Sequence, residues 1–335
     1  MDLNLNLIKL LIQNKNNKSK NTVNSSYLTM VLKKILTLPQ VVYKFGVYST
    51  LKMIFRKFYI PIKLSKFNLK KEYQITVNNY EILTMPNDKG ISSELLVFRV
   101  HEPLHTELLS RELKKGMVCL DIGANIGYYA LLENNKVGNT GKVIAIEPSP
   151  INFKQLKKNI MLQENSNVEV HNFACGNYDG FTKFSVSEIS NWSRIVGEKD
   201  FASDEILSIV DIPIKKIDSF LETVNLSTID IIRMDVEGYE CQVIEGMLNT
   251  IYKYNPLLVL EFHTSLVNIE DAKKILIKLK KMGYKIKYYF HRELDLPMLS
   301  DMKNVQSMDV NMLIQILDNP SFSKTFTVFF SNRDD

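Results

Sequence analysis

The sequence predicts an α/β fold built on a mostly parallel, Rossmann-like sheet of seven strands. From about residue 116, short β-branched apolar runs alternate with amphipathic segments of helix length, the pattern of βα units in a parallel sheet. A glycine-containing turn follows the first of these runs, at the place where open α/β sheets bind ligands. The 335 residues, 45% hydrophobic and 24% charged, are sufficient to bury a sizeable core.

The expected elements follow from hydrophobic periodicity and from turn and capping residues. Seven runs are expected to be strands: 117–122, 142–147, 168–173, 229–235, 257–262, 285–290 and 325–330. Helices are expected at 126–136, 150–163, 239–252 and 269–282. Residues 73–77 and 80–84, separated by Asn78-Asn79, predict a hairpin before the sheet, and 183–186 with 208–214 predict an inserted one.

Composition divides the chain into three parts: a flexible tail at 1–26, a basic helical and hairpin extension at 27–94, and the main domain at 95–335. Residues 1–71 hold 14 Lys or Arg against one acid, Asp2, which gives +13 and leaves −8 for the remainder. The basic part could therefore pack on the domain, bind an anionic membrane surface through residues 27–71, or bind nucleic acid. We expect nucleic acid to be the least favoured of these partners.

The expected location is the cytoplasm, with association at the inner face of the membrane as an alternative. The N-terminus lacks the basic cluster and cleavage pattern of a signal peptide, and charged residues interrupt the apolar run 28–60. The three cysteines have no metal-binding or disulfide spacing, and we expect Cys119 and Cys241 to be buried small hydrophobic residues.

Residues 121–129, DIGANIGYY, predict a nucleotide-cofactor site. A carboxylate, Asp121, stands at the end of a strand, and Gly123 and Gly127 then open a helix. Glycine there permits a tight turn and a close approach of ligand to backbone. The next strand ends at Glu147, where an acid accepts hydrogen bonds from ribose hydroxyls.

The turn itself distinguishes two cofactors. A dinucleotide fingerprint needs three glycines for the pyrophosphate, but Asn125 and Tyr128 occupy the second and third positions. S-adenosylmethionine has no phosphate, and its sulfonium and ammonium groups favour a nearby carboxylate. The sequence therefore favours S-adenosylmethionine over NAD.

Five blocks, in this order and spacing, resemble the FkbM-type methyltransferases: 121–129 (DIGANIGYY), 147–153 (EPSPINF), 217–220 (IDSF), 231–240 (IIRMDVEGYE) and 260–263 (LEFH). The resemblance covers roughly residues 95–290 and implies the class I methyltransferase sheet. It also implies O-methylation of a hydroxyl on a sugar, a glycan, a lipid-linked glycan or a natural product. Arg233 departs from the lysine that we expect in the family, and the two side chains are not equivalent in a bidentate contact.

Class I methyltransferases contact adenine at the end of the third strand, where Asn172 could bond the base edge and Phe173 could pack on its face. A turn asparagine and a core phenylalanine are the alternative. The expected cofactor-binding residues are Asp121, Gly123, Ala124, Asn125, Gly127, Tyr128, Glu147, Pro148, Asn172, Phe173 and Asp235.

Four residues at the ends of two neighbouring strands are expected to carry the chemistry: Asp235, Glu237, Glu261 and His263. Methyl transfer needs a positioned acceptor oxygen and a base that takes its proton. Glu237 or His263 is the expected base, with Asp235 orienting the acceptor or the cofactor amine. The same residues could hold Mg²⁺ or Mn²⁺, although we expect no metal.

Two further segments are open to more than one interpretation. Residues 187–207, with Trp192, Arg194 and Phe201, predict either an acceptor-recognition lid or a plain surface insertion. His101, Glu102 and His105 are expected to form an exposed polar helix start, a cap on the cofactor pocket being the alternative.

Two other functions compete with a methyltransferase of small molecules or glycans. An RNA methyltransferase draws on the basic N-terminal part, but the domain that carries the site is acidic and lacks a basic aromatic face. A nicotinamide-dependent oxidoreductase conflicts with Asn125 and Tyr128 in the turn.

Overall fold

A computed structural model describes residues 50, 52, 55–164, 166–187, 189–196, 206–319 and 325–333. The expected flexible tail at 1–26, the expected helices at 27–49 and Phe201 lie outside the described residues. The chain divides into two compact units at Ile54/Phe55, and all that follows concerns the second. The boundary expected at residue 94 falls inside that unit.

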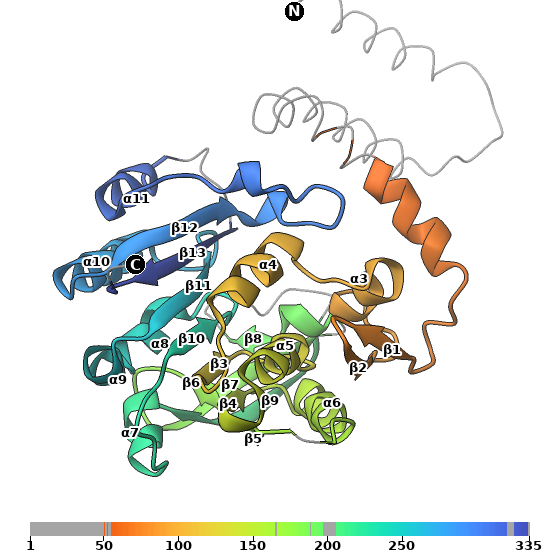
Figure 1. Cartoon of the computed structure of the whole chain (residues 1–335), viewed down its shortest axis with the longest axis horizontal. Coiled ribbons are helices and arrows are strands. Elements are labelled where there is room, and N and C mark those ends of the chain that lie inside the picture. Colours follow the sequence, from red (N-terminus) through yellow and green to blue (C-terminus); the bar gives the residue numbers. More distant parts are fainter. Residues whose placement is uncertain are drawn as a thin grey trace, which may run out of the picture. The chain divides into compact units, whose positions relative to one another are not determined.

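The main sheet has seven strands in the order β12-β13-β11-β10-β3-β4-β5 (Figure 1). Strand β13 is antiparallel to its neighbours β11 and β12, and the other pairs are parallel. This is the class I methyltransferase sheet, as predicted. Its strands are β3 (Val118–Ile122), β4 (Lys142–Ile146), β5 (Val168–His171), β10 (Ile231–Met234), β11 (Leu257–His263), β12 (Lys285–His291) and β13 (Thr325–Ser331).

Both faces of the sheet are buried, because alternate residues of each strand enter different hydrophobic clusters. In β4, Ile144 and Ile146 pack in one cluster, and Val143 and Ala145 pack in the other. The first cluster is covered by α7 (Ile217–Glu222), α8 (Glu240–Glu245), α9 (Leu248–Tyr254), α10 (Ile269–Lys281) and α11 (Val310–Ile316). The second is covered by α3 (Ile91–Phe98), α4 (Pro103–Glu112), α5 (Tyr128–Val137), α6 (Pro150–Met161) and the hairpin β1 (Gln74–Val77) and β2 (Tyr80–Leu83).

The seven predicted strands and the hairpin before the sheet are confirmed within two residues at each end. The predicted helices at 126–136, 150–163 and 269–282 are confirmed as α5, α6 and α10. Local capping explains two of these starts: Ser149 accepts the N–H of Asn152 with Pro150 at the first helical position, and Asn268 accepts the N–H of Glu270.

The single helix predicted at 239–252 is wrong, since the chain forms two short helices, α8 and α9, there. Gly246 packs against the distant backbone at Gly176, so closely that a Cβ at position 246 would lie 1.9 Å from the carbonyl oxygen of Gly176. Its own carbonyl accepts the N–H of Asp218, whose carboxylate accepts the N–H of Thr250 at the start of α9. A tertiary contact therefore overrides helical periodicity at this point.

The inserted hairpin is confirmed and is larger than predicted. It forms β7 (Gly180–Ser187) and β9 (Ile206–Lys215), which join β6 (Ala174–Cys175) and β8 (Arg194–Ile195) in a second sheet with the order β6-β9-β7-β8. Cys119, Cys175 and Cys241 are buried and unbonded, as expected for the first and last of them. No helix among the described residues is long and apolar enough to cross a membrane.

Candidate active site

Two adjoining cavities lie beyond the carboxyl ends of β3, β4, β10 and β11. The first is lined by residues after β3, β4 and β10, by residues 173–175 and by the inserted sheet. The second extends toward α4 and the end of β12. The cavities share four lining residues: Gly123, Asn125, Asp235 and Glu237. A group that passes from one cavity to the other must therefore pass these residues.

The turn at 121–129 folds tightly because two glycines take the left-handed conformation. Gly123 has φ +84°, and a Cβ there would lie 1.9 Å from the carbonyl oxygen of Asp235. Gly127 has φ +94°, and its Cβ would lie 2.7 Å from the Cδ1 atom of Leu156. These positions exclude larger residues, and they bring the backbone at 123–125 to the wall of both cavities.

Glu147 is buried in the first cavity and holds the turn from the neighbouring strand. Its Oε2 atom accepts the N–H of Asn125 at 2.8 Å, and its Oε1 atom accepts the N–H of Ser149 at 2.8 Å. Burial, opposed by these hydrogen bonds, raises the pKa of Glu147 to about 7. The carboxyl group keeps lone pairs for a ligand hydroxyl, since each oxygen can accept more than one hydrogen bond.

Pro148 and Phe173 line the first cavity beside Glu147, and Ala124 and Tyr128 line the second. Asn172 lines neither cavity. Its side-chain amide donates to the carbonyl oxygens of Glu147 and Pro148, which fixes the ends of β4 and β5 together. A direct contact of Asn172 with adenine stays a prediction.

Asp121 is fully buried and its carboxylate faces Arg233 rather than a cavity. The Nη1 atom of Arg233 donates to Asp121 Oδ1 at 3.0 Å, and its Nη2 atom donates to Asp235 Oδ2 at 3.1 Å. The guanidinium also lies over the ring of Tyr129, 4.1 Å from its centroid. The two carboxylates raise the pKa of Arg233, although burial acts to lower it. Asp121 thus fixes the cation that orients Asp235.

Glu237, Glu261 and His263 come together as predicted, and a third acid, Glu240, joins them. The Nε2 atom of His263 lies 3.1 Å from Glu237 Oε2 and 3.6 Å from Glu261 Oε1, and its Nδ1 atom lies 2.6 Å from Glu240 Oε1. The surrounding carboxylates raise the pKa of His263 well above its usual value, against the effect of burial. Burial raises the pKa of Glu237 to about 8, which the charge of His263 opposes.

Backbone strain also marks this end of the sheet. Glu237 and Asn125 both take φ +51°, a conformation that is uncommon outside glycine, and both line the two cavities. Glu102, in the wall of the second cavity, takes φ +44°. Such residues gather at functional sites when the surrounding structure holds them in place.

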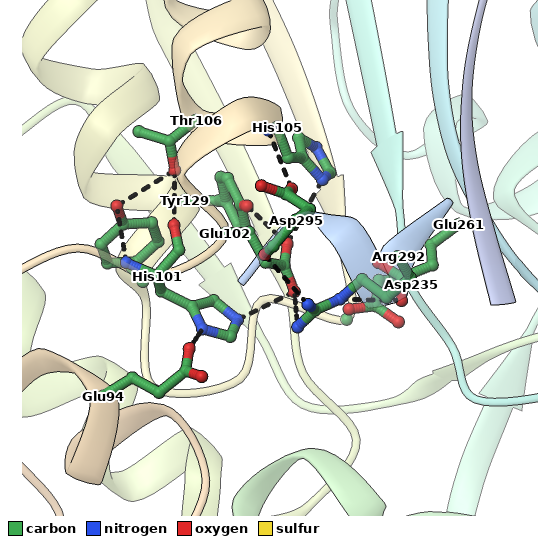
Figure 2. A network of polar contacts seen from close by, with 12 residues as sticks. Glu94, His101, Glu102, His105, Thr106, Tyr129, Asp235, Glu261, Arg292 and Asp295 are labelled. Carbon is green, nitrogen blue, oxygen red and sulfur yellow. Dashed lines mark hydrogen bonds and ion pairs between the residues drawn. The ribbon is translucent and has the colours of Figure 1, made fainter. Parts of the chain in front are cut away.

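The expected exposed helix start at His101, Glu102 and His105 is wrong, because all three side chains are buried. Glu102 lies at the centre of a polar network that forms one wall of the second cavity (Figure 2). It accepts the hydroxyl of Tyr129 at 2.6 Å and lies 3.0 Å from His101 Nε2 and 2.6 Å from Arg292 Nη2. These partners compensate the burial of its charge.

Arg292 connects this wall to the chemical residues, since its Nε atom lies 3.5 Å from Glu261 Oε1. Sequence reasoning did not select Arg292, Arg233 or Glu240 as functional residues, and it gave Glu102 only in the alternative of a cap on the cofactor pocket. Glu240 could have been found, because it closes the 231–240 block. Arg292 carries no local signal: it reaches the site only because β12 ends beside α4.

Within the part of the chain that the structure describes, two groups of side chains have spacings that could hold a metal ion, with candidate ligand atoms within 4.8 Å of one another. One is Asp235, Glu237 and His263, and the other is Glu102, His105 and Glu261. Carboxylate and imidazole ligands of this kind suit Mg²⁺ or Mn²⁺. Arg233 and Arg292 already supply positive charge beside both groups. Our expectation of no metal stays a prediction.

The family models that this chain matches, and two known proteins similar to it, are methyltransferases. Residues 121–286 match the family described as the methyltransferase FkbM domain, and residues 33–186 match protein-L-isoaspartate(D-aspartate) O-methyltransferase. The hexuronic acid methyltransferase AglP of Haloferax volcanii is 26% identical over 174 residues, which cover 52% of this chain and 66% of that protein. Methyltransferase 1 of Beauveria bassiana is 24% identical over 172 residues, covering 47% and 69%.

Among solved structures, the methyltransferase FkbM of Methylobacillus flagellatus matches with 15% identity and a TM-score of 0.39, covering 71% of this chain and 53% of that one. Fibrillarin of Aeropyrum pernix, solved with S-adenosyl-L-methionine, matches with 11% identity and a TM-score of 0.39, covering 78% and 86%. The chain therefore spans just under two thirds of the Haloferax protein and about half of the Methylobacillus chain.

Proposed function

This chain belongs to the S-adenosylmethionine-dependent FkbM methyltransferase family, and from that premise we propose that it methylates a hydroxyl oxygen of a sugar, a glycan, a lipid-linked glycan or a natural product. One observation carries the proposal: Asp235 and Glu237 line both cavities, so that acidic groups stand where a donor in the first would meet an acceptor in the second. Similarity to a protein named for methylating a hexuronic acid supports a sugar acceptor.

The residues of the first cavity fit the methyl donor. Glu147 is placed to accept ribose hydroxyls, and Phe173 and Pro148 offer apolar surface for an adenine ring. Asn125 occupies the position where a dinucleotide turn needs glycine, which suits a ligand without phosphate. When bound, S-adenosylmethionine supplies an electrophilic methyl group. Asp235, held by Arg233, lines both cavities and can orient a cationic donor or the acceptor hydroxyl.

Glu237 is the residue that we assign as the base. It lines both cavities, whereas His263 lines only the second and has carboxylates at both ring nitrogens. A carboxyl group with a pKa of about 8 is matched to proton transfer near neutral pH. His263 then positions Glu237 and stabilises its charge, while Glu240 fixes the ring from the other side.

A ligand and acceptor test addresses this proposal. S-adenosylhomocysteine should raise the thermal midpoint of the full chain and NAD should not, because only ligands that bind the native state stabilise it. With S-adenosylmethionine, the enzyme should form S-adenosylhomocysteine in the presence of sugars and not with total RNA. Stabilisation by NAD alone, or transfer to RNA but to no sugar, would contradict the proposal.

We also propose that the basic N-terminal part brings the enzyme to an anionic membrane surface. Residues 55–64 are helical, and Phe55, Phe58 and Ile62 are 54%, 68% and 65% exposed at the spacing of one helical face. Lys57 is exposed on the same helix. An amphipathic basic helix of this kind binds anionic lipid headgroups.

Vesicle sedimentation separates this proposal from simple surface exposure. The Phe58→Glu/Ile62→Glu variant should lose binding to vesicles that contain anionic lipid. A Met161→Glu/Tyr252→Glu variant, which alters two residues that are 82% and 81% exposed elsewhere, should keep it. Equal binding of both variants, or binding to uncharged vesicles alone, would contradict membrane association through this helix.

A further inference from the structure

The second cavity presents cations that are already paired with carboxylates. Among the described residues that line it, the arginines are Arg233 and Arg292. Arg233 binds Asp121 and Asp235, and Arg292 lies 2.6 Å from Glu102 and 3.5 Å from Glu261. A guanidinium whose charge is balanced by two carboxylates attracts a third anion only weakly, although the Nε atom of Arg233 still has no hydrogen-bond partner.

Among the described lining residues are two histidines, each likewise paired with two carboxylates. His101 lies between Glu94, at 2.7 Å, and Glu102, at 3.0 Å. His263 lies between Glu240 and Glu237. Each positive group on the wall is thus balanced from within the protein, and an anionic ligand would have to displace one of these carboxylates.

Of the four buried polar atoms of the described lining residues that have no hydrogen-bond partner, three are oxygen acceptors and the fourth is the Nε atom of Arg233. Asp235 Oδ1 and Glu261 Oε2 are buried oxygen atoms without a hydrogen-bond partner, and both residues line the cavity. Such atoms accept hydrogen bonds from hydroxyl or ammonium groups of a ligand. Burial and the nearby charges of Asp235 and Glu102 raise the pKa of Glu261 well above its usual range, so negative charge is already crowded here.

Trp192 gives the cavity its apolar surface on the side of the inserted sheet. Its side chain is 46% exposed and lines the second cavity. An indole face can pack against the C–H face of a sugar ring, while carboxylates opposite bind the ring hydroxyls. This combination favours a polyhydroxylated ring over an apolar natural product.

We infer that the acceptor is a sugar without an anionic group, a neutral hexose or an amino sugar, rather than a uronic acid or a sugar phosphate. The inference rests on the proposed function and narrows its substrate class. It separates this chain from the Haloferax relative, whose name specifies a hexuronic acid. Specificity against the anion arises because its charge would face unpaired carboxylate oxygens.

Matched glycosides test the inference. Methyl glycosides of glucose, glucosamine and glucuronic acid, with the galacto and manno counterparts, are offered to the full chain with S-adenosylmethionine and EDTA. Formation of S-adenosylhomocysteine gives kcat/KM, and saturation-transfer NMR on the S-adenosylhomocysteine complex gives binding. In whichever of the gluco, galacto and manno series reacts, kcat/KM for the uronide should be at least about 10-fold lower than for the neutral or amino sugar. One mismatched polar group gives discrimination of this order.

Each other outcome overturns the inference in a recognisable way. A uronide that reacts best in EDTA contradicts it directly. A uronide that reacts best only after Mn²⁺ is added also contradicts it, and points to a cation at Asp235, Glu237 and His263. If no sugar is methylated and none binds by NMR, while S-adenosylhomocysteine still binds, the acceptor is not a sugar. The inference then fails together with the proposed function.

A variant pair tests the local charge argument. Glu102→Gln removes the ionised carboxylate that lies 2.6 Å from Arg292 and should raise the ratio of uronide to hexoside turnover by about 5-fold, whatever its effect on the total rate. Glu107→Gln removes an exposed carboxylate that pairs with Arg111 on α4 and should leave the ratio unchanged. An unchanged ratio in Glu102→Gln would overturn the assignment of specificity to this wall.

Discussion

The two cavities differ in how the chain builds them. The walls of the first come from short segments that follow β3, β4, β5 and β10 and from the inserted sheet, and its buried carboxyl group, Glu147, is held by backbone N–H groups. The second cavity also takes in His101 and Arg292, and its carboxylates are held by other side chains. The proposed donor site thus depends largely on strand-end segments and their backbone, whereas the proposed acceptor site depends on side chains that only the tertiary structure brings together.

This difference has an energetic side. Backbone donors at a strand end form whenever the sheet forms, so the first cavity is organised by the fold itself. Side-chain networks in a low-dielectric wall are strong when complete and costly when one member is lost. Substitutions in the second cavity should therefore affect turnover and specificity, and substitutions in the first should affect donor affinity.

The largest expected effect is on turnover, at the boundary of the two cavities. Glu237→Gln removes the base that we assign and should lower kcat by roughly 100- to 10,000-fold, the usual contribution of general-base catalysis. The affinity for S-adenosylhomocysteine, measured by calorimetry, should stay near that of the wild type. Glu245→Gln, which alters an exposed acid on α8, the helix that follows Glu237, is the matched control and should keep full turnover. A Glu237→Gln enzyme with normal kcat, together with normal kcat in His263→Ala, would refute the assignment.

In the first cavity we expect a smaller effect, on the affinity for the donor rather than on turnover. Glu147→Ala removes the acceptor of the ribose hydroxyls and should weaken S-adenosylhomocysteine binding by roughly 10- to 100-fold, the range for hydrogen bonds to a charged group. At saturating donor, kcat should change little, because the boundary residues are unaffected. Calorimetry and initial rates measure the two quantities. A large loss of kcat with unchanged affinity would show that the two cavities are not separable in this way.

The pH dependence of turnover gives a second test of Glu237, which lies at the boundary of the two cavities. Burial raises the pKa of Glu237 to about 8, and the base must be deprotonated to accept a proton. The rate should therefore rise with pH, by about 10-fold from pH 7 to pH 9, and level off above that. Profiles of kcat at saturating substrates measure it. A rate that falls over this interval would mean that the acidic form of the pair is the active one.

The sequence predicts these two regions unequally. All seven strands are found within two residues, because buried parallel strands are continuous apolar runs and their order along the chain follows the βα pattern. Gly123, Asn125 and Glu147 were placed correctly at one cavity, since strand ends meet at one edge of a sheet. Asp121 could not be placed in this way: its residue type suggested a ligand contact, but its side chain binds Arg233.

The acceptor wall escaped prediction for two physical reasons. A polar run such as 101–105 looks like a solvated helix start when its partners are unknown, and the partner, Arg292, is separated from it by most of the domain. The break between α8 and α9 likewise depends on the contact of Gly246 with Gly176, which no local pattern records. Local propensity is a weak guide wherever tertiary contacts decide the outcome.

The smallest expected effect is on the stability of the fold, at the contact between α4 and the loop after β12 beside the second cavity. Asp295 is fully buried and accepts the N–H groups of Leu104 and His105, so that it caps α4 from the loop after β12. Asp295→Ala should lower the free energy of unfolding by about 1 to 2 kcal/mol, as for the loss of a helix cap, and the thermal midpoint by a few degrees.

Because burial raises the pKa of Asp295 to about 7, its ionised form is disfavoured in the native state. The stability that it contributes through protonation is complete below its unfolded pKa and is lost as the pH rises through 7. Thermal midpoints of the wild type and of Asp295→Ala should therefore converge between about pH 4 and pH 7 and keep a constant difference above pH 7. A constant difference over the lower interval as well would show instead that the two backbone hydrogen bonds, and not the protonation of Asp295, fix α4 against the acceptor wall.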